Sequence, residues 1–433
     1  MATTIDHPLN EIEFWQILQN IVVKIGSGHT TIVPSSSSVN HYNALSHEVL
    51  PFLIYIQKDK LYLKRFINKT DSSFRVGDEI LRINGEKSYS LLMRIRNLCS
   101  GDGLSNSFKD YRLQQGAFNQ IYNILYGDLS SFDVVYKSGT EIKTKTVQAA
   151  TIQSNMSLDL STTKNQYHSI YSLPQLQQTD SVNAKHTVLY STNSPYTAIL
   201  KINEFDYKDF KVFHEQVFRS LKNRNIKNLI LDLRGNPGGY DRICIDLMKY
   251  LLGKNFYFSP AEEGHTNINI AMKTIDNPDF HSADTTLITY SPYKIINQEN
   301  KLQSPYKNTF SGSLYLIVDG GTFSAASLLA VAIKDQRKNT FVVGRETGGN
   351  KSGSDGGQIL SVTLPNTRFQ LIIPLLWAYS VDKQENNGYG LKPDIEIVYS
   401  AMDVYNFLAK KGDADIFRIE SEINLINTPP VVH

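Results

Sequence analysis

The chain has 433 residues, more than a single hydrophobic core usually organises, so two or three domains are expected. Its apolar fraction of 41% and charged fraction of 20% are typical of a soluble globular protein, and 44 basic against 42 acidic side chains give a net charge of +2. This balance gives no indication of a nucleic acid or another polyanion as a partner.

The two cysteines, Cys99 and Cys244, each lie in an apolar helical context without a second cysteine or a histidine at metal-ligand spacing. We expect buried free thiols, no metal site and no organic cofactor. No window reaches the roughly eighteen apolar residues of a membrane span. Residues 1–6 lack the basic start and apolar core of a signal peptide. The expected compartment is therefore either the cytoplasm or, if an export signal was removed, the periplasm or cell envelope.

The first predicted element is a helix over residues 10–25, because apolar side chains recur there at helical spacing up to the Gly-Ser-Gly stop at residues 26–28. His29 follows this stop directly. The polar serine run at residues 35–38 predicts a loop. We expect residues 1–45 to form an amino-terminal helical segment that carries His29.

Residues 46–150 are predicted to form a β-rich domain. Its expected strands lie at residues 52–56, 60–66 and 79–83, near Val134 and at 143–147, and its expected helices at residues 88–98 and 115–125. Asn84-Gly85 is typical of a hairpin turn. Residues 151–185 are rich in Ser, Thr, Gln and Asn with little periodicity, which predicts a linker.

The remainder, residues 186–433, alternates apolar strands with amphipathic helices. Strands are expected at residues 196–202, 229–233 and 314–318, and helices at residues 208–224, 242–252 and 325–336. This order predicts an α/β domain with a largely parallel sheet. Residues 253–312 interrupt it as a long insertion without clear periodicity.

Ser324 stands between the strand at residues 314–318 and the helix at residues 325–336. A serine on a sharp strand-to-helix turn is well placed as a nucleophile, since the first amides of the helix would point toward an oxyanion formed beside it. The alternative is structural, because Ser324 or Thr322 can simply cap the helix.

Residues 232–239, with the sequence DLRGNPGG, lie at the carboxyl end of a buried strand, where ligands gather in open α/β sheets. Gly238 and Gly239 allow the backbone to approach a substrate or to present an amide to it. The alternative is a tight turn that needs positive φ angles. A phosphate loop is disfavoured because its lysine and its glycine spacing are missing.

Two residues are candidate bases for a serine nucleophile. His29 follows a small-residue stretch that would leave its imidazole accessible, although histidine is also common at helix ends, where its cation interacts with the helix dipole. Lys351 lies in the glycine-rich segment of residues 344–353, which is also compatible with a plain hairpin loop. A lysine acts as a base only when it is desolvated.

Taken together, these segments resemble the C-terminal processing, or tail-specific, serine peptidase family, and in particular its tricorn-like, histidine-bearing branch. The matching blocks, in the order of the family, are IGSGHT (25–30), DLRGNPGG (232–239), TFSAA (322–326), GRETGG (344–349) and GYGLKPDI (388–395). Residues 74–85, FRVGDEILRING, are similar to part of a PDZ-like domain, which this family often carries.

The resemblance implies that Ser324 is the nucleophile and that the amides of Ala325 and of Gly238 or Gly239 form the oxyanion hole. It also favours His29 as general base, worth about 10²–10⁴-fold in rate. An oxyanion donor would contribute about 3 to 4 kcal/mol of transition-state stabilisation.

The sequence departs from the family pattern at two positions. Lysine-dyad members carry the lysine in a Gly-Lys-Gly turn, and here that position is Asn350, with Lys351 displaced by one residue. The tricorn-like branch places a glutamate just before the Gly-x-Gly element, where this chain has Asn387, with Glu385 two residues earlier. Glu385 is therefore the predicted acid of the site.

The fold that the resemblance implies is a crotonase-like (ClpP-like) α/β core combined with a PDZ-like domain and the amino-terminal helical segment. The implied activity is hydrolysis of peptides or unfolded proteins through an acyl-enzyme. Two alternatives stay open: a catalytically inactive binding protein on the same scaffold, and a Ser-Lys dyad peptidase that uses Lys351. The sequence makes no prediction about the oligomeric state.

Overall fold

The computed structural model describes residues 7–67, 71–153, 176–178, 185–194, 196–264, 294–295, 302–382, 387–408 and 411–427. The chain divides into two compact units. The amino-terminal unit comprises Met1–Thr163, Gly264–Lys294 and Asp355–Leu376, and the carboxyl-terminal unit comprises Lys164–Glu263, Ile295–Ser354 and Trp377–His433. Most of the predicted linker and of the predicted insertion lies outside the described residues. The domain boundaries drawn from the sequence stay predictions.

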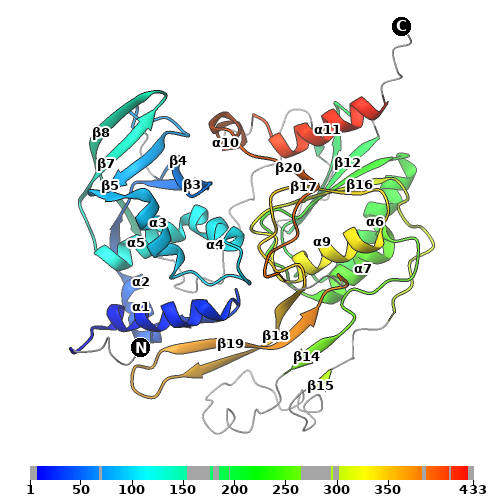
Figure 1. Cartoon of the computed structure of the whole chain (residues 1–433). Coiled ribbons are helices and arrows are strands. Elements are labelled where there is room, and N and C mark those ends of the chain that lie inside the picture. The colour runs from blue at the N-terminus through cyan, green and yellow to red at the C-terminus, as the bar shows by residue number, and fades with distance from the viewer. Residues whose placement is uncertain are drawn as a thin grey trace. The chain divides into compact units, whose positions relative to one another are not determined.

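The amino-terminal unit begins with helices and continues into an antiparallel sheet (Figure 1). Its elements are α1 (Glu11–Val22), η2 (Val23–Ile25), β1 (Thr31–Val33), α2 (Ser36–Ala44), β2 (Ser46–Val49), β3 (Phe52–Gln57), β4 (Lys60–Phe66), β5 (Glu79–Ile83), β6 (Glu86–Lys87), α3 (Ser88–Arg96), α4 (Ser107–Arg112), η3 (Leu113–Ala117), α5 (Phe118–Tyr126), β7 (Ser131–Ser138), β8 (Glu141–Gln148) and β9 (Ala150–Gln153). The sheet has the order β3-β4-β5-β7-β8, with β6 paired to β5, while β2 pairs with β9.

The hairpin turn predicted at Asn84-Gly85 is confirmed, because both residues have positive φ angles (47° and 80°) and the turn joins β5 to β6. The loop predicted at residues 35–38 is wrong. Ser35 is instead the N-cap of α2 and accepts a hydrogen bond from the N–H of Ser38. Helix α2 was not predicted because its sequence is polar and lacks the apolar stripe from which helices are recognised.

The carboxyl-terminal unit contains a seven-stranded sheet in the order β10-β11-β12-β13-β16-β17-β20. Its elements are β10 (Leu176–Gln178), β11 (His186–Ser191), β12 (Thr197–Ile202), α6 (Phe210–Asn223), β13 (Asn228–Asp232), α7 (Asp241–Leu251), β16 (Ser313–Val318), α9 (Ala325–Gln336), β17 (Thr340–Gly344), β20 (Ile395–Glu396), α10 (Ala401–Leu408) and α11 (Ala414–Asn427). Strands β12, β13, β16, β17 and β20 run parallel, which confirms the largely parallel α/β core.

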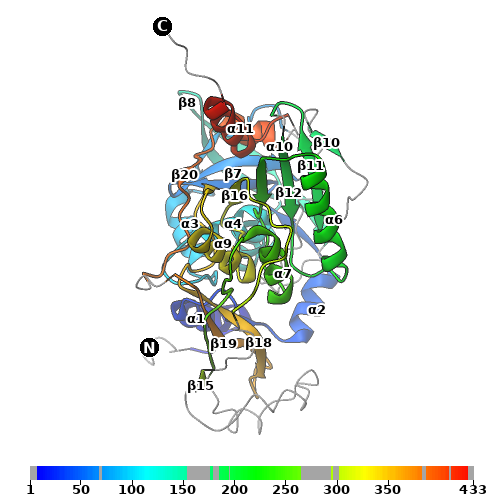
Figure 2. The ribbon, with the colours of Figure 1, turned by 90° about the vertical axis from the view of Figure 1, so that its right-hand side faces the viewer.

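Both faces of this sheet are covered. Leu229 and Leu231 of β13 belong to the core shared with α6, α7 and α9, whereas Ile230 packs on the opposite face with Ile416 and Ile419 of α11. Figures 1 and 2 show α6, α7 and α9 along one face and α11 along the other. Parallel strands buried on both faces read as continuous apolar runs, as these do.

A long hairpin joins β18 (Gly353–Thr363) to β19 (Gln370–Tyr379). Strand β1 pairs antiparallel with β19, with Thr31 opposite Ile372. The short strands β14 (Glu262–Gly264) and β15 (Lys294–Ile295) continue this sheet in the order β1-β19-β14-β15. The pairing of β1 matters for the site because His29 lies two residues before that strand.

A buried ion network fixes the end of β13. The guanidinium of Arg234, which is 3% exposed, contacts the carboxylates of Asp232, Asp413 and Asp415. Lys201 adds an ion pair to Asp232 at 3.2 Å. Because removing one partner of such a network leaves a buried charge uncompensated, the loop that follows β13 is held firmly to the start of α11.

Among the described residues, no helix combines the length and the apolar character that a membrane crossing requires. Cys99 and Cys244 are both buried and form no disulfide, as predicted.

Candidate active site

Ser324 occupies a strained turn between β16 and α9. Its backbone angles are φ 51° and ψ −131°, a region that residues other than glycine rarely occupy and that costs about 1–3 kcal/mol. The side chain of Ser324 makes no capping hydrogen bond to α9, so the interpretation of this residue as a helix cap is wrong. Strain of this kind is typical of functional sites.

The turn is held in place by its neighbours. The carboxylate of Asp319 accepts hydrogen bonds from the N–H groups of Gly321 at 2.9 Å and Gly235 at 2.8 Å. The hydroxyl of Thr322 donates to the carbonyl of Leu233 at 2.8 Å. These bonds join the segment before Ser324 to the DLRGNPGG loop, so the two candidate motifs form one rigid structure.

Gly238 of that loop lies directly against the serine. A Cβ atom added to Gly238 would lie 2.8 Å from the Cβ of Ser324 and 2.9 Å from the backbone nitrogen of Ala325, so no side chain fits. The N–H of Gly238 donates to the side-chain oxygen of Asn236 at 2.9 Å. Within the described residues, the N–H groups of Gly239 and Ala325 donate to no protein acceptor. These two amides are therefore free for a substrate oxygen.

Two further motifs meet the same turn. The N–H groups of Gly348 and Gly349 donate to the carbonyl of Thr322 at 3.0 and 3.2 Å. The hydroxyl of Thr347 accepts the N–H of Leu391 at 2.8 Å, which joins the Gly-x-Gly element to this cluster. A Cβ on Gly349 would lie 2.6 Å from the Cβ of Ser327, so this position also requires glycine.

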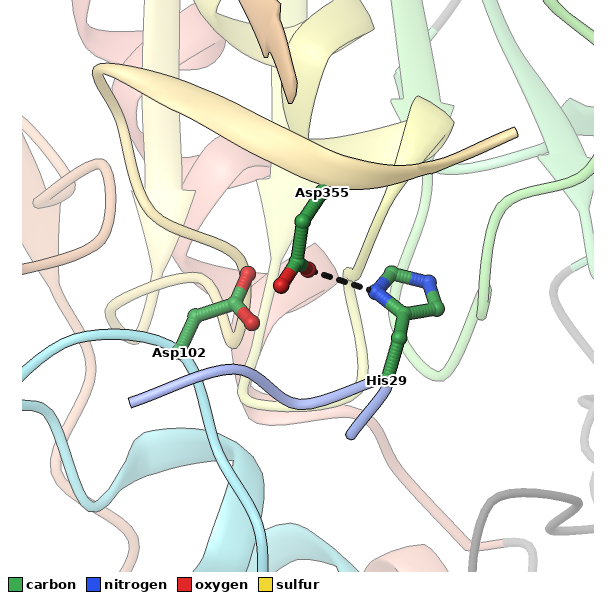
Figure 3. Close-up of side chains that lie close together, drawn as sticks. All are labelled: His29, Asp102 and Asp355. Atoms are coloured by element: carbon green, nitrogen blue, oxygen red, sulfur yellow. Dashed lines mark hydrogen bonds and ion pairs between the residues drawn. The ribbon is translucent and has the colours of Figure 1, made fainter. Parts of the chain in front are cut away.

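His29 lies on a loop between η2 and β1 and faces Asp355, as Figure 3 shows. Gly26 ends the helix in the left-handed conformation, with φ 71°. The Nδ1 atom of His29 lies 2.9 Å from a carboxylate oxygen of Asp355, and the two side chains are 20% and 14% exposed. With Nδ1–H donating to this carboxylate, Nε2 is left as the proton acceptor, which is the tautomer that a general base needs.

Asp102 is the third member of this group, and only 3% of it is exposed. Its Oδ1 atom accepts the N–H of Gly28 at 2.6 Å, and the N–H of Gly103 donates to the carbonyl of Gly26 at 2.8 Å. The loop at residues 102–103 therefore holds the backbone on the amino-terminal side of His29.

His29, Asp102 and Asp355 each offer a ligand atom, and these atoms lie within 4.8 Å of one another. One imidazole and two carboxylates form a possible ligand set for a divalent cation. The direct contact between His29 and Asp355 equally fits an acid that orients a base, and we adopt that interpretation. Sequence reasoning missed both aspartates, because no local motif marks them. Asp355 meets His29 only through contacts between segments that lie far apart in the sequence.

The remaining predicted site residues are Lys351, the alternative base, and Glu385, the predicted acid. The Nζ atom of Lys351 lies 3.4 Å from a carboxylate oxygen of Asp382, and its side chain is 14% exposed. An ammonium held in an ion pair is a hydrogen-bond donor, which disfavours Lys351 as a base. Glu385 lies outside the described residues.

The candidate residues are distributed over both units. Ser324, Gly238, Gly239 and Ala325 belong to the carboxyl-terminal unit, whereas His29 and the two aspartates belong to the amino-terminal unit. The structure thus presents a strained serine with two free amides in one unit and an imidazole oriented by a carboxylate in the other.

Comparisons with known proteins agree with these motifs. Residues 196–397 match the model of peptidase family S41. Carboxyl-terminal-processing peptidase 3, chloroplastic, from Arabidopsis thaliana is 25% identical over 191 residues, which are 44% of this chain and 29% of that protein. The match thus spans less than a third of that relative's length.

Solved structures show that the likeness in fold extends over nearly the whole chain. Mature CPAF complexed with lactacystin has a TM-score of 0.61 at 14% identity, covering 96% of this chain and 88% of that one. A crystal structure of a CPAF mutant has a TM-score of 0.64 at 14% identity, covering 99% and 90%. The segment that matches peptidase family S41, residues 196–397, contains the DLRGNPGG loop and Ser324, and the solved structures show that the similarity of fold extends beyond this segment.

Proposed function

We propose that this protein is a serine peptidase that hydrolyses peptide bonds through an acyl-enzyme, with Ser324 as nucleophile and His29 as general base. The observation that carries the proposal is the positive-φ turn at Ser324, which lies against Gly238 at the start of α9 and whose side chain makes no capping hydrogen bond to that helix. A structural serine would not require this strain, whereas an exposed nucleophile on a strand-to-helix turn does.

In the proposed mechanism, the Nε2 atom of His29 takes the proton from Ser324 while Oγ attacks the carbonyl carbon of the scissile bond. The tetrahedral oxyanion accepts hydrogen bonds from the N–H groups of Ala325 and Gly239. The imidazolium then gives its proton to the leaving amine, and an acyl-enzyme remains. Water, deprotonated by His29, attacks the ester and releases the new carboxyl terminus.

The first refinement concerns the oxyanion hole. Both Gly238 and Gly239 are sequence candidates, but the N–H of Gly238 already donates to Asn236. Using it for the oxyanion would require breaking that bond. We therefore assign the second donor to Gly239, together with Ala325 at the start of α9, where the helix dipole adds to the stabilisation.

The second refinement concerns the acid. We assign to Asp355 the role that the sequence suggests for Glu385, because the carboxylate of Asp355 is the one that contacts His29. It would hold the Nδ1–H tautomer and stabilise the imidazolium that forms during each proton transfer. Asp102 would act as a positioning residue through the backbone of Gly28.

The match of residues 196–397 to a peptidase family supports protein substrates. The Arabidopsis relative is named for carboxyl-terminal processing, and we propose the same class of reaction here, with peptides or unfolded proteins as substrates. That the domain with the antiparallel sheet β3-β4-β5-β7-β8 is PDZ-like stays a prediction. In such a domain an extended substrate chain would bind by adding a strand to the edge of the sheet.

A serine-reactive fluorophosphonate probe tests the proposal. We expect the wild-type protein to be labelled and Ser324→Ala not to be. His29→Gln should label about 10²–10⁴-fold more slowly, because the general base is lost. Equal labelling of the wild type and Ser324→Ala would refute the nucleophile, and normal labelling of His29→Gln would refute the base. A wild-type protein that neither labels nor cleaves an unfolded protein would favour the inactive binding protein.

A further inference from the structure

The amino-terminal unit contains a cavity of about 880 Å³ that the proposed mechanism does not use. Helices α1 and α2, strand β1 and the end of α5 form its walls. Its apolar lining consists of Ile12, Trp15, Ile32, Pro34, Leu45 and Leu125, together with Ile124. Cavities of about 300–1,000 Å³ with an apolar lining and a few polar groups are typical of ligand sites.

The lining of this cavity is rich in carboxylates. Glu11, Glu13 and Asp128 line it, together with two histidines, and no lysine or arginine does. Each carboxylate is held through one oxygen: Glu11 accepts from the hydroxyl of Ser38 at 2.7 Å, and Glu13 from the N–H of Asn10 at 2.9 Å. In the described part of the chain, the second oxygen of each receives no hydrogen bond.

Asp128 follows the same pattern. Its Oδ1 atom is contacted by Asn123 at 2.8 Å, by the N–H of Glu48 at 3.2 Å and by His47 at 3.3 Å, and no described residue donates to Oδ2. Burial alone would raise the pKa of Asp128, but these hydrogen bonds and the charge of His47 lower it below its usual value. The carboxylate is therefore fixed in place, ionised and open on one side.

The cavity shares its walls with the loop that carries His29. The indole N–H of Trp15 donates to the carbonyl of Ile32 at 3.1 Å, and the N–H of Ile32 donates to the side chain of Gln19 at 3.2 Å. These bonds hold α1 to β1, and His29 lies between these two elements. An occupant that touches Trp15 and Ile32 thus contacts the helix that precedes that loop and the strand that follows it.

We propose that this cavity binds a peptide segment in which apolar side chains alternate with lysine or arginine, and that its occupancy changes the reactivity of the site by moving the loop of His29. The apolar walls would take the aliphatic and aromatic side chains, and the open carboxylate oxygens would accept from the cationic groups. The proposed change in reactivity rests on the proposed function, whereas the proposed binding of a peptide in the cavity does not.

The chain offers a built-in reporter, because Trp15 and Trp377 are its only two tryptophans. The full-length double variant Ser324→Ala, Trp377→Phe keeps Trp15 as the single indole and removes the proposed nucleophile, so a probe peptide is not consumed. The probe is the acetylated and amidated pentapeptide Leu-Arg-Phe-Lys-Leu, and the control is Leu-Glu-Phe-Glu-Leu. We expect a saturable change in Trp15 emission with the basic peptide at concentrations below about 1 mM and none with the acidic one.

Isosteric changes then test the carboxylates. Glu13→Gln keeps the cap of α1 and Asp128→Asn keeps an acceptor for Asn123, yet each removes a charge, and together they should weaken binding about tenfold. Glu141→Gln on β8, where Glu141 forms an ion pair with Lys143 at 2.9 Å and does not line the cavity, should leave binding unchanged. Equal binding of both peptides, or no saturation by either, would overturn the binding site.

The coupling is measured in the protein with Ser324 intact. Saturating basic peptide should change the rate of fluorophosphonate labelling by about threefold or more, and the Glu13→Gln, Asp128→Asn variant should lose that response. An unchanged rate at full occupancy would overturn the coupling. Failure of the proposed function would look different, because the wild type would then not label at all while the emission of Trp15 still titrated.

Discussion

Replacing Asp355 by asparagine tests how the base is oriented. The carboxylate of Asp355 lies 2.9 Å from Nδ1 of His29, and asparagine has nearly the same shape. It can, however, turn its amide so that an N–H faces Nδ1. The imidazole would then carry its proton on Nε2 and lose its ability to accept the proton of Ser324.

The size of the effect follows from two contributions. A hydrogen bond to a charged group contributes about 1.5–3 kcal/mol, which corresponds to roughly 10–150-fold in rate, and the shift to the wrong tautomer adds to this loss. Asp355 is 14% exposed, so water offsets part of the electrostatic stabilisation. We expect the rate for Asp355→Asn to fall by about 10²–10³-fold, less than in a fully buried triad.

The assay is the second-order rate of fluorophosphonate labelling, together with kcat/KM for cleavage of an unfolded protein such as casein. The matched control is Asp102→Asn, because asparagine at that position can still accept the N–H of Gly28 and should lower the rate by less than about tenfold. A rate for Asp355→Asn within about threefold of wild type would refute the assignment of this acid. Equal losses in both variants would instead assign a joint role to the two carboxylates.

Three further outcomes are expected. Lys351→Ala should change labelling by less than about threefold, because Lys351 is paired with Asp382 and the proposed base is His29. Gly349→Ala should lower the free energy of unfolding by about 1–3 kcal/mol in urea titrations, because its Cβ would lie 2.6 Å from that of Ser327. Two effects lower the pKa of His186 to about 4: mainly burial of the imidazole, and to a lesser extent the charge of His214. The unfolded chain then binds more protons, so stability should fall as the pH drops from about 6.5 to 4, by about 1 to 2 kcal/mol, and His186→Phe should reduce this dependence.

The sequence was sufficient to predict those elements whose conformation depends on a few neighbouring residues. The hairpin turn at Asn84-Gly85 and the helix beginning at Ala325 have the predicted conformation, because turn residues and amphipathic spacing act over a few positions. The alternation of apolar strands with amphipathic helices likewise predicted the largely parallel sheet. The α/β class could therefore be inferred without coordinates, and the family resemblance seen in the sequence agrees with the family that residues 196–397 match.

The partners of His29 could not be found in this way. His29 and Asp355 are 326 positions apart, and they meet because β1 pairs with β19, with Thr31 opposite Ile372. That register depends on packing in the assembled unit and has no local signature. Asp102 contacts the His29 loop through a backbone N–H, an interaction that leaves no pattern of residue types to search for.

The strain at Ser324 explains why its neighbourhood is so heavily bonded. An angle of φ 51° at a residue with a side chain costs about 1–3 kcal/mol and persists only if the surroundings over-determine it. The N–H of Phe323 donates to the carbonyl of Asn236 at 2.9 Å, and the hydroxyl of Thr322 bonds to Leu233. Each net hydrogen bond contributes about 0.5–1.5 kcal/mol, so two or three offset the strain. The same bonds join the DLRGNPGG loop to the turn, where Gly238 lies against Ser324 and the backbone nitrogen of Ala325, so the interactions that hold the serine in its strained conformation also fix the backbone of the proposed oxyanion hole.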